Sequence, residues 1–105
     1  MEIIFKEKAL EELYEDGSTK DHKYNKLPND VVKRYCKVVN YLRALEKISD
    51  LYSIKSLHYE KKMGTLKGIE VVWITQKYRL LFNTVRENNE LLVSALLFEI
   101  SKHYE

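Results

Sequence analysis

The sequence predicts an α+β domain in which two N-terminal helices pack on one face of a small antiparallel β-sheet. Two observations lead to this class: apolar residues recur at helical spacing in the first half of the chain, and the second half holds three runs rich in Val, Ile, Leu and aromatic residues. A chain of 105 residues can bury one hydrophobic core but not two. We therefore expect a single domain spanning residues 1–105.

The N-terminal segment is predicted to form a short strand followed by a helix. Residues 1–5 (MEIIF) are β-prone. Over residues 6–16 the apolar side chains recur at helical spacing, and Gly17 is placed to end the helix. Residues 17–25 (GSTKDHKYN) are polar and should form a loop.

The second helix is predicted to begin at Asn29 or Asp30 and to end near Lys47. Either of the first two residues is a suitable cap, and Leu27 is placed to pack back on the helix as a hydrophobic staple. The apolar residues that repeat at steps of three and four are Val32, Tyr35, Val39, Leu42 and Leu45. We expect the polar face to be solvated surface rather than a site; it comprises Lys33, Lys37, Asn40, Arg43, Glu46 and Lys47.

The second half of the chain changes to a β pattern. Residues 50–55 are expected to connect the second helix to this part. Polar turns are predicted at residues 76–77 and 86–90. The three antiparallel strands that they separate are predicted at residues 69–75, 78–84 and 91–100.

Composition and motifs exclude several classes of function. No apolar run approaches the roughly 20 residues that span a bilayer, and the N-terminus lacks a signal peptide. We therefore expect a cytoplasmic protein with no membrane partner. The single cysteine, Cys36, cannot form an internal disulfide, and the three histidines are too far apart in sequence to suggest a metal site. No glycine-rich phosphate loop or nucleophile turn is present, which argues against nucleotide hydrolysis and acyl transfer. No cofactor is implied.

Positive charge is concentrated in the middle of the chain. The net charge is only +2, but residues 55–79 carry six basic and two acidic side chains. Residues 1–54 are balanced, and residues 80–105 carry two basic and four acidic side chains. A basic stripe of this kind suits RNA or an acidic protein as partner, and a merely solvated basic face is the alternative.

The polar groups near the predicted sheet suit metal-independent cleavage of RNA. In that reaction the 2′-hydroxyl attacks its own phosphate, so one proton must be taken, another given, and charge on the phosphoryl oxygens stabilised. Histidine carries protons near neutral pH, and arginine and lysine stabilise phosphate charge. The side chains available for these roles are His58, Tyr59, Lys61, Lys62, Lys77, Arg79, His103 and Tyr104.

Two strand residues, Trp73 and Arg79, need an explanation. Alternation with a period of two groups Trp73 with Val71 and Thr75, and Arg79 with Leu81 and Asn83. An arginine flanked by apolar residues costs desolvation unless an anion, an acidic side chain or water receives it. The alternative to a substrate anion is a salt bridge to one of three carboxylates, Glu60, Glu70 or Glu99.

The chain contains, in order, the segments LPNDVVKRYCKVVNYLRAL, DLYSIKSLHYEKKMG, QKYRLLF and EISKHYE. Together they resemble the HigB-type branch of the RelE superfamily of bacterial toxins, over nearly the whole chain. The resemblance implies a compact RelE-like sheet with N-terminal helices and a ribosome-dependent endoribonuclease that cuts messenger RNA in the decoding site. The implied partners are a HigA-like helix-turn-helix antitoxin, the ribosome and mRNA, with no direct DNA binding by this chain alone.

The resemblance also implies roles for particular residues. His58 and His103 are the implied groups for proton transfer, and Arg79 is the implied group for phosphate stabilisation. Lys61 is implied in RNA contact, and Tyr104 in stacking or proton transfer.

Two departures from the family pattern bear on activity. Lys62 and Met63 stand where a leucine and a lysine are expected, and Trp73 stands where relatives commonly carry arginine. Because tryptophan cannot neutralise a phosphate, either Lys62 and Lys77 restore the charge as RNA-binding residues, or cleavage is weak, or the pocket is altered. We expect Trp73 to fill the core rather than to stack on a base.

Three functions are therefore weighed. The first is a ribosome-dependent mRNA interferase. The second is a catalytically weakened or inactive RelE-fold protein that binds an antitoxin without cleaving RNA. The third is a gyrase poison on the same fold, which His58 and His103 disfavour because a steric poison needs no proton carriers.

Overall fold

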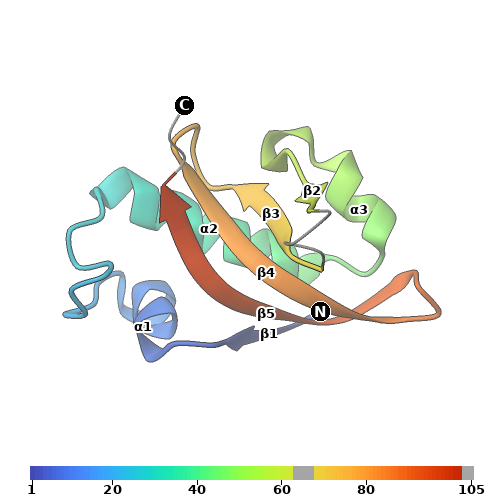
Figure 1. Cartoon of the computed structure of the whole chain (residues 1–105), viewed down its shortest axis with the longest axis horizontal. Coiled ribbons are helices and arrows are strands. Elements are labelled where there is room, and N and C mark those ends of the chain that lie inside the picture. Colours follow the sequence, from blue (N-terminus) through green and yellow to red (C-terminus); the bar gives the residue numbers. More distant parts are fainter. Residues whose placement is uncertain (63–67, 103–105) are drawn as a thin grey trace.

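The computed structural model describes residues 1–62 and 68–102, which form a five-stranded sheet with its helices on one face (Figure 1). The strands are β1 (Glu2–Phe5), β2 (Glu60–Lys61), β3 (Glu70–Trp73), β4 (Tyr78–Glu87) and β5 (Leu91–Lys102). The helices are α1 (Lys8–Asp16), α2 (Asn29–Ala44), α3 (Ile48–Ser53) and the 3-10 helix η1 (Lys55–Leu57).

The strand order across the sheet is β1-β5-β4-β3-β2. β1 runs parallel to β5, and every other neighbouring pair is antiparallel. The predicted α+β class, with two N-terminal helices on one face of a mostly antiparallel sheet, is therefore confirmed. Within the described residues, no helix has both the length and the apolar character needed to cross a membrane.

The core lies between the sheet and the apolar stripes of α1 and α2. Leu42 of α2, Phe82 of β4 and Leu97 of β5 are fully buried in it. Tyr35 is also fully buried, and its hydroxyl donates a hydrogen bond of 2.8 Å to the carbonyl of Leu10 in α1. This bond satisfies the polar tip of the ring and ties the two helices together.

The end of α1 is where the sequence predicts it. Gly17 has a φ of 76°, a left-handed conformation that glycine adopts without steric cost. Its N–H donates to the carbonyl of Leu13 at 3.1 Å and closes the last turn.

The start of α2 is predicted correctly, but its predicted cap is wrong. Pro28 precedes the first turn, and no side chain makes a capping hydrogen bond, so neither Asn29 nor Asp30 acts as the cap. Proline suits this end of a helix because it has no N–H to satisfy and its φ is compatible with the first turn. Leu27 is half-buried against the core, as expected of a staple.

α2 ends at Ala44 rather than near Lys47. Leu45 has a ψ of 140°, so the chain is already extended there. The N–H of Leu92, at the start of β5, donates to the carbonyl of Glu46 at 2.8 Å. Pairing with a distant strand therefore ends the helix, and no local pattern could have signalled it.

The segment at residues 50–55 connects α2 to the strands as predicted, but most of it is helical, which the sequence pattern did not predict. Asp50 accepts hydrogen bonds from the backbone N–H groups of Glu46 and Lys47, at 3.2 and 3.1 Å. This carboxylate caps the start of α3 from inside the helix, and Leu51 anchors it with a fully buried side chain.

The β4–β5 hairpin is longer than predicted. Residues 86–90 are not all turn, because β4 continues to Glu87 and pairs with β5 up to that point. The reversal is made at Asn88 and Asn89, whose φ values of 53° and 60° suit a tight hairpin turn. Arg86, expected in the turn, lies in the strand instead.

Candidate functional site

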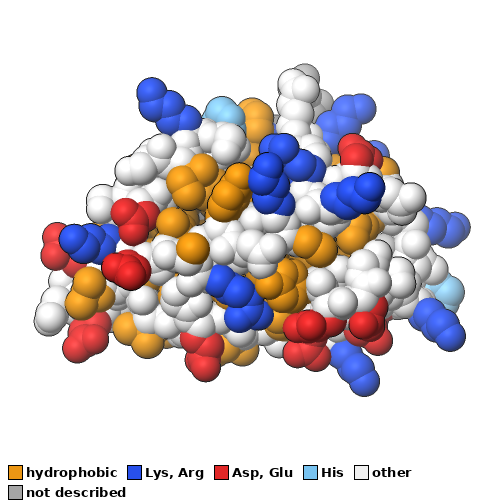
Figure 2. Space-filling model, turned by 180° about the vertical axis from the view of Figure 1, so that it is seen from behind, with side chains coloured by type: hydrophobic (Ala, Val, Ile, Leu, Met, Phe, Trp, Pro, Cys, Tyr) orange, Lys and Arg blue, Asp and Glu red, His pale blue; other side chains and the backbone are white. Residues whose placement is uncertain are grey.

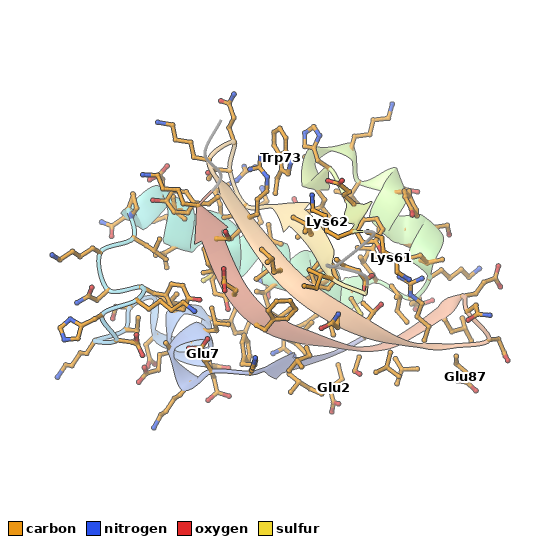
Figure 3. All side chains as sticks on the ribbon, in the orientation of Figure 1. Glu2, Glu7, Lys61, Lys62, Trp73 and Glu87 are labelled. Carbon is orange, nitrogen blue, oxygen red and sulfur yellow. The ribbon has the colours of Figure 1, made fainter. Side chains whose placement is uncertain are left out.

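An open pocket of about 510 Å³ lies on the face of the sheet opposite the helices. Its charged and aromatic lining consists of His58, Glu60, Lys62, Trp73, Arg79 and Lys102. Figure 3 shows Trp73 at the end of β3 and Lys62 beside the same strand. Three cationic side chains and one anionic side chain therefore surround the pocket, which favours a negatively charged ligand.

Strand register brings these side chains together. Trp73 of β3 pairs with Arg79 of β4, and Arg79 in turn pairs with Ser101 of β5. Val72 and Leu80, which alternate with these residues, are fully buried on the helix side. The predicted grouping of residues by face is therefore confirmed for Trp73 and Arg79, and the two share one face.

Arg79 is held by backbone carbonyls. Its Nη1 donates to the carbonyls of Thr75 and Gln76 at 2.8 Å each and to that of Tyr78 at 3.3 Å. Partial burial lowers the pKa of the guanidinium, which nevertheless stays charged because arginine titrates far above neutral pH. Nη1 donates all three of these bonds, and no described residue accepts a hydrogen bond from Nε or Nη2 of Arg79. They are donors available to an anion in the pocket.

The expected alternative, a salt bridge from Arg79 to a nearby carboxylate, is wrong for the described residues. Each of the three candidates pairs with another cation: Glu60 with Lys62 at 3.3 Å, Glu70 with Arg86 at 2.7 Å and Glu99 with Lys23 at 3.9 Å. The guanidinium of Arg79 therefore lines the pocket without a salt bridge to any of these three carboxylates.

Trp73 is not a core residue, so the expectation that it fills the core is wrong. Its side chain is only half-buried and lines the pocket. The imidazole of His58 stacks on it, with ring centroids 3.7 Å apart and planes 26° apart. The guanidinium carbon of Arg79 lies 4.1 Å from the centre of its ring, a cation–π contact. One indole therefore contacts two of the three residues implied in catalysis, His58 and Arg79.

His58 reaches the pocket through an unusual backbone conformation. It follows η1 with φ 47° and ψ 46°, in the left-handed region that residues other than glycine rarely adopt. Its N–H donates to the carbonyl of Lys55 at 3.1 Å, which closes the short helix. The strain of such a conformation persists only where surrounding contacts enforce it, and functional sites are where it concentrates.

The three other predicted basic residues within the described part of the chain do not share one location. Lys62 lines the pocket and forms the ion pair with Glu60. Lys61 pairs with Glu70 across β2 and β3, one position out of step with the pocket face, and does not line the pocket. Lys77 is exposed in the turn between β3 and β4 and is also outside the lining.

His103 and Tyr104, predicted to act in catalysis and RNA binding, lie outside the described residues, as does Met63. Sequence reasoning missed Lys102, which lines the pocket from the end of β5. The missing signal was the pairing of the end of β5 with the start of β4, where Lys102 lies opposite Tyr78 and next to the pocket-face pair of Ser101 and Arg79.

A second feature that sequence reasoning missed is a buried polar network centred on Glu70. This carboxylate is only 2% exposed and accepts hydrogen bonds from the Tyr59 hydroxyl at 2.6 Å and from the Arg86 guanidinium at 2.7 Å. The backbone N–H and the hydroxyl of Thr84 also donate to it, at 2.7 and 2.8 Å. The network ties β3 to β4 and to the chain just after His58.

The network determines the charge states of its members. Burial, and then the hydrogen bond to Glu70, raise the pKa of Tyr59 well above the ordinary value of tyrosine. Burial alone would lower the pKa of Arg86, but the hydrogen bond and negative charge of Glu70 outweigh it and raise that pKa. Tyr59 therefore stays protonated and Arg86 charged, which suits a structural support. Among the described residues, no three His, Cys, Asp or Glu side chains gather closely enough to hold a metal ion.

Comparison with known proteins decides the family. Residues 3–96 match the model of the HigB-like toxins, described as the RelE-like toxin of the type II toxin–antitoxin system HigB. The chain belongs to this family. Membership implies an antitoxin as partner, and the HigB-like resemblance of the sequence segments is thereby confirmed.

Individual relatives of this HigB-like chain agree with the assignment. The toxin HigB-1 of Vibrio cholerae serotype O1 is 31% identical over 85 residues, which are 81% of this chain and 85% of that protein. The solved structure of a YoeB/ParE toxin from Agrobacterium tumefaciens superposes with a TM-score of 0.57 at 10% identity, covering 99% of this chain and all of that one. At so low an identity, the second likeness concerns the fold alone.

Proposed function

We propose that this HigB-like toxin cuts messenger RNA on the ribosome, without a metal, by attack of a ribose 2′-hydroxyl on the adjacent phosphate. The observation that carries the proposal is the set of contacts that Arg79 makes in the pocket. Its guanidinium contacts the ring on which His58 stacks, in an open pocket, and each carboxylate expected to neutralise it pairs with another cation. A cation and an imidazole in one pocket are the kinds of group that phosphodiester cleavage requires.

Each pocket residue has a proposed step. His58 takes the proton from the 2′-hydroxyl or gives one to the departing 5′-oxygen as the bond from that oxygen to phosphorus breaks. Arg79 donates from Nε and Nη2 to the phosphoryl oxygens, where negative charge builds up. Lys62 and Lys102 add positive charge at the edge of the pocket. The products are a 2′,3′-cyclic phosphate and a free 5′-hydroxyl.

The residues outside the described part of the chain complete the proposal. His103, which directly follows the pocket residue Lys102 in the sequence, is proposed as the second proton carrier. Tyr104 is proposed to stack on a base or to assist proton transfer. Lys61 and Lys77 lie outside the pocket, so any RNA that they contact is away from the reacting phosphate.

The ribosome is proposed to position the message. An open pocket on a small sheet has few groups with which to orient a flexible strand, and a bound message in the decoding site is already ordered. The protein would then act in the cytoplasm, and the antitoxin is proposed to be a HigA-like helix-turn-helix protein. No cofactor is proposed.

The test is translation of a defined message in a cell-free system, with and without the purified toxin, with the new RNA ends mapped by primer extension. We expect cuts that require ribosomes and disappear with Arg79→Ala. Arg43→Ala is the matched control, because Arg43 is an exposed arginine of α2 outside the pocket. Normal translation with no cuts by the folded wild-type protein would support instead an inactive antitoxin-binding member of the fold.

A further inference from the structure

A second, smaller cleft lies between α2 and η1. It has a volume of about 120 Å³. The residues that matter for its chemistry are Arg34, Lys37, Tyr41, Ser56 and Trp73. We call it the α2 cleft. The sequence pattern indicates that Lys37 belongs to a solvated face, but in the fold this side chain lines a cleft.

The α2 cleft adjoins the pocket on the opposite face of the sheet. Trp73 lines both, so the two are separated by no more than one side chain. β2, the edge strand, is only two residues long and covers only the start of β3. At the other end of β3, His58 stacks on Trp73, and Trp73 stands between the two sites.

The lining of the α2 cleft suits a phosphate group. Arg34 and Lys37 supply two positive charges, and none of the described residues that line the cleft is a carboxylate. Ser56 and Tyr41 offer hydroxyl groups, and the ammonium of Lys37 lies 5.8 Å from the centre of the Tyr41 ring. Figure 2 shows this side of the molecule, where Lys and Arg side chains gather near the upper middle of the view.

The side chains around the cleft can accept a ligand without refolding. Arg34 and Lys37 are both exposed. Arg34 makes one long contact, from Nε to the carbonyl of Ile74 at 3.5 Å, which orients it beside β3. The remaining guanidinium nitrogens can form the paired hydrogen bonds that arginine makes with phosphate oxygens.

We propose that the α2 cleft binds a backbone phosphate of the same RNA strand, next to the nucleotide that is cleaved in the pocket. This inference rests on the proposed RNA cleavage and adds to it a second point of attachment. A strand held on both sides of Trp73 is fixed in direction as well as in position, which sets the phosphate that meets Arg79 and His58.

The test combines a protein change with a change in the RNA. Messages are prepared in which one phosphate near the cut, upstream or downstream, is replaced by an uncharged methylphosphonate. Cleavage of each message on ribosomes is measured with the wild-type toxin and with the double variant Arg34→Ala, Lys37→Ala. We expect the double variant to lower kcat/KM about tenfold or more on the unmodified message.

The decisive result is non-additivity at one position. If the cleft holds a message phosphate, neutralising that phosphate lowers cleavage by the wild-type protein but causes no further loss in the double variant. Losses that multiply at every tested position would overturn the proposal and indicate that these side chains contact ribosomal RNA or a protein instead. Equal cleavage by both proteins would overturn it too.

Two controls distinguish a failure of this proposal from a failure of the proposed RNA cleavage on which it rests. The variant Lys26→Ala, Lys33→Ala removes the same number of charges from exposed lysines outside both sites and should cleave as the wild type does. If the wild-type protein itself makes no ribosome-dependent cuts, the proposed function fails and the α2 cleft loses its assigned ligand. If it does cut, any failure belongs to the α2 cleft alone.

Discussion

The guanidinium of Arg79 lies 4.1 Å from the centre of the Trp73 ring, across a directly opposed pair of β3 and β4. The same ring stacks on His58. Trp73 therefore adds no charge to the site, but it contacts both the group proposed to move a proton and the group proposed to bind phosphate.

Trp73→Ala should lower kcat/KM for ribosome-dependent cleavage about fivefold to thirtyfold. The reason is that Arg79 and His58 lose the ring that orients them, a contact worth about 1–2 kcal/mol in a partly desolvated site. Trp73→Phe keeps an aromatic face and should retain most of the activity. Equal losses in the two variants would show that the aromatic ring is not what matters.

Glu70→Ala should lower the free energy of unfolding by about 3 kcal/mol, measured by urea titration. The change leaves the charge of Arg86 and the hydroxyl of Tyr59 without their buried acceptor. The matched control is Glu60→Ala, because the ion pair of Glu60 with Lys62 is exposed and should contribute less than about 1 kcal/mol. Similar values for both variants would contradict a structural role for the network.

Stability should fall as the pH rises above 10. Burial raises the pKa of Tyr35 far above the ordinary tyrosine value of 10.0, so the folded protein keeps a proton that the unfolded chain loses. Unfolding then releases a proton and is favoured by alkaline pH, by about 1 kcal/mol per pH unit from this residue. Urea unfolding at pH 8 and pH 11 measures the fall.

The variant Tyr35→Phe tests whether Tyr35 causes the loss of stability at alkaline pH, because it lacks the hydroxyl that titrates. It should cost about 1 kcal/mol at pH 8, because the hydrogen bond to the carbonyl of Leu10 is lost. It should also lose less stability than the wild type between pH 8 and pH 11. A fall of the same size in both proteins would remove Tyr35 as its source.

Asn89→Gly should raise the free energy of unfolding by about 0.5 kcal/mol. Asn89 has a φ of 60° in the turn between β4 and β5, and glycine occupies this left-handed region without the steric cost of a side chain. Asn89→Val should have the opposite effect, a loss of about 1–2 kcal/mol. Destabilisation by glycine would mean that the turn is not left-handed in solution.

The helices α1 and α2 and the strands β3, β4 and β5 follow from local patterns in the sequence. The spacing of apolar residues and the position of Gly17 predict α1, and the same spacing predicts most of α2, because a helix buries one stripe of its own consecutive turns. His58 and Arg79 are also found from short motifs, since the chemical role of an imidazole or a guanidinium follows from the residue type itself.

The remaining features depend on pairing between distant segments. α2 ends early because Glu46 bonds to Leu92, and Arg86 belongs to a strand because Glu70 lies beside it. Neither contact is visible in the residues that flank either partner. The helix or strand propensity of single residues contributes little free energy in such cases, and burial and hydrogen bonding in the fold outweigh it.

The sequence by itself determined the α+β class, the family and three residues of the candidate site, His58, Lys62 and Arg79. Only the tertiary structure decided that Trp73 lies in the pocket rather than in the core, that Lys102 lines the same pocket, and that Lys61 does not. The physical reason is pairing between distant segments: Trp73 pairs with Arg79 and Arg79 with Ser101, whereas Lys61 pairs with Glu70, and this register depends on the whole sheet.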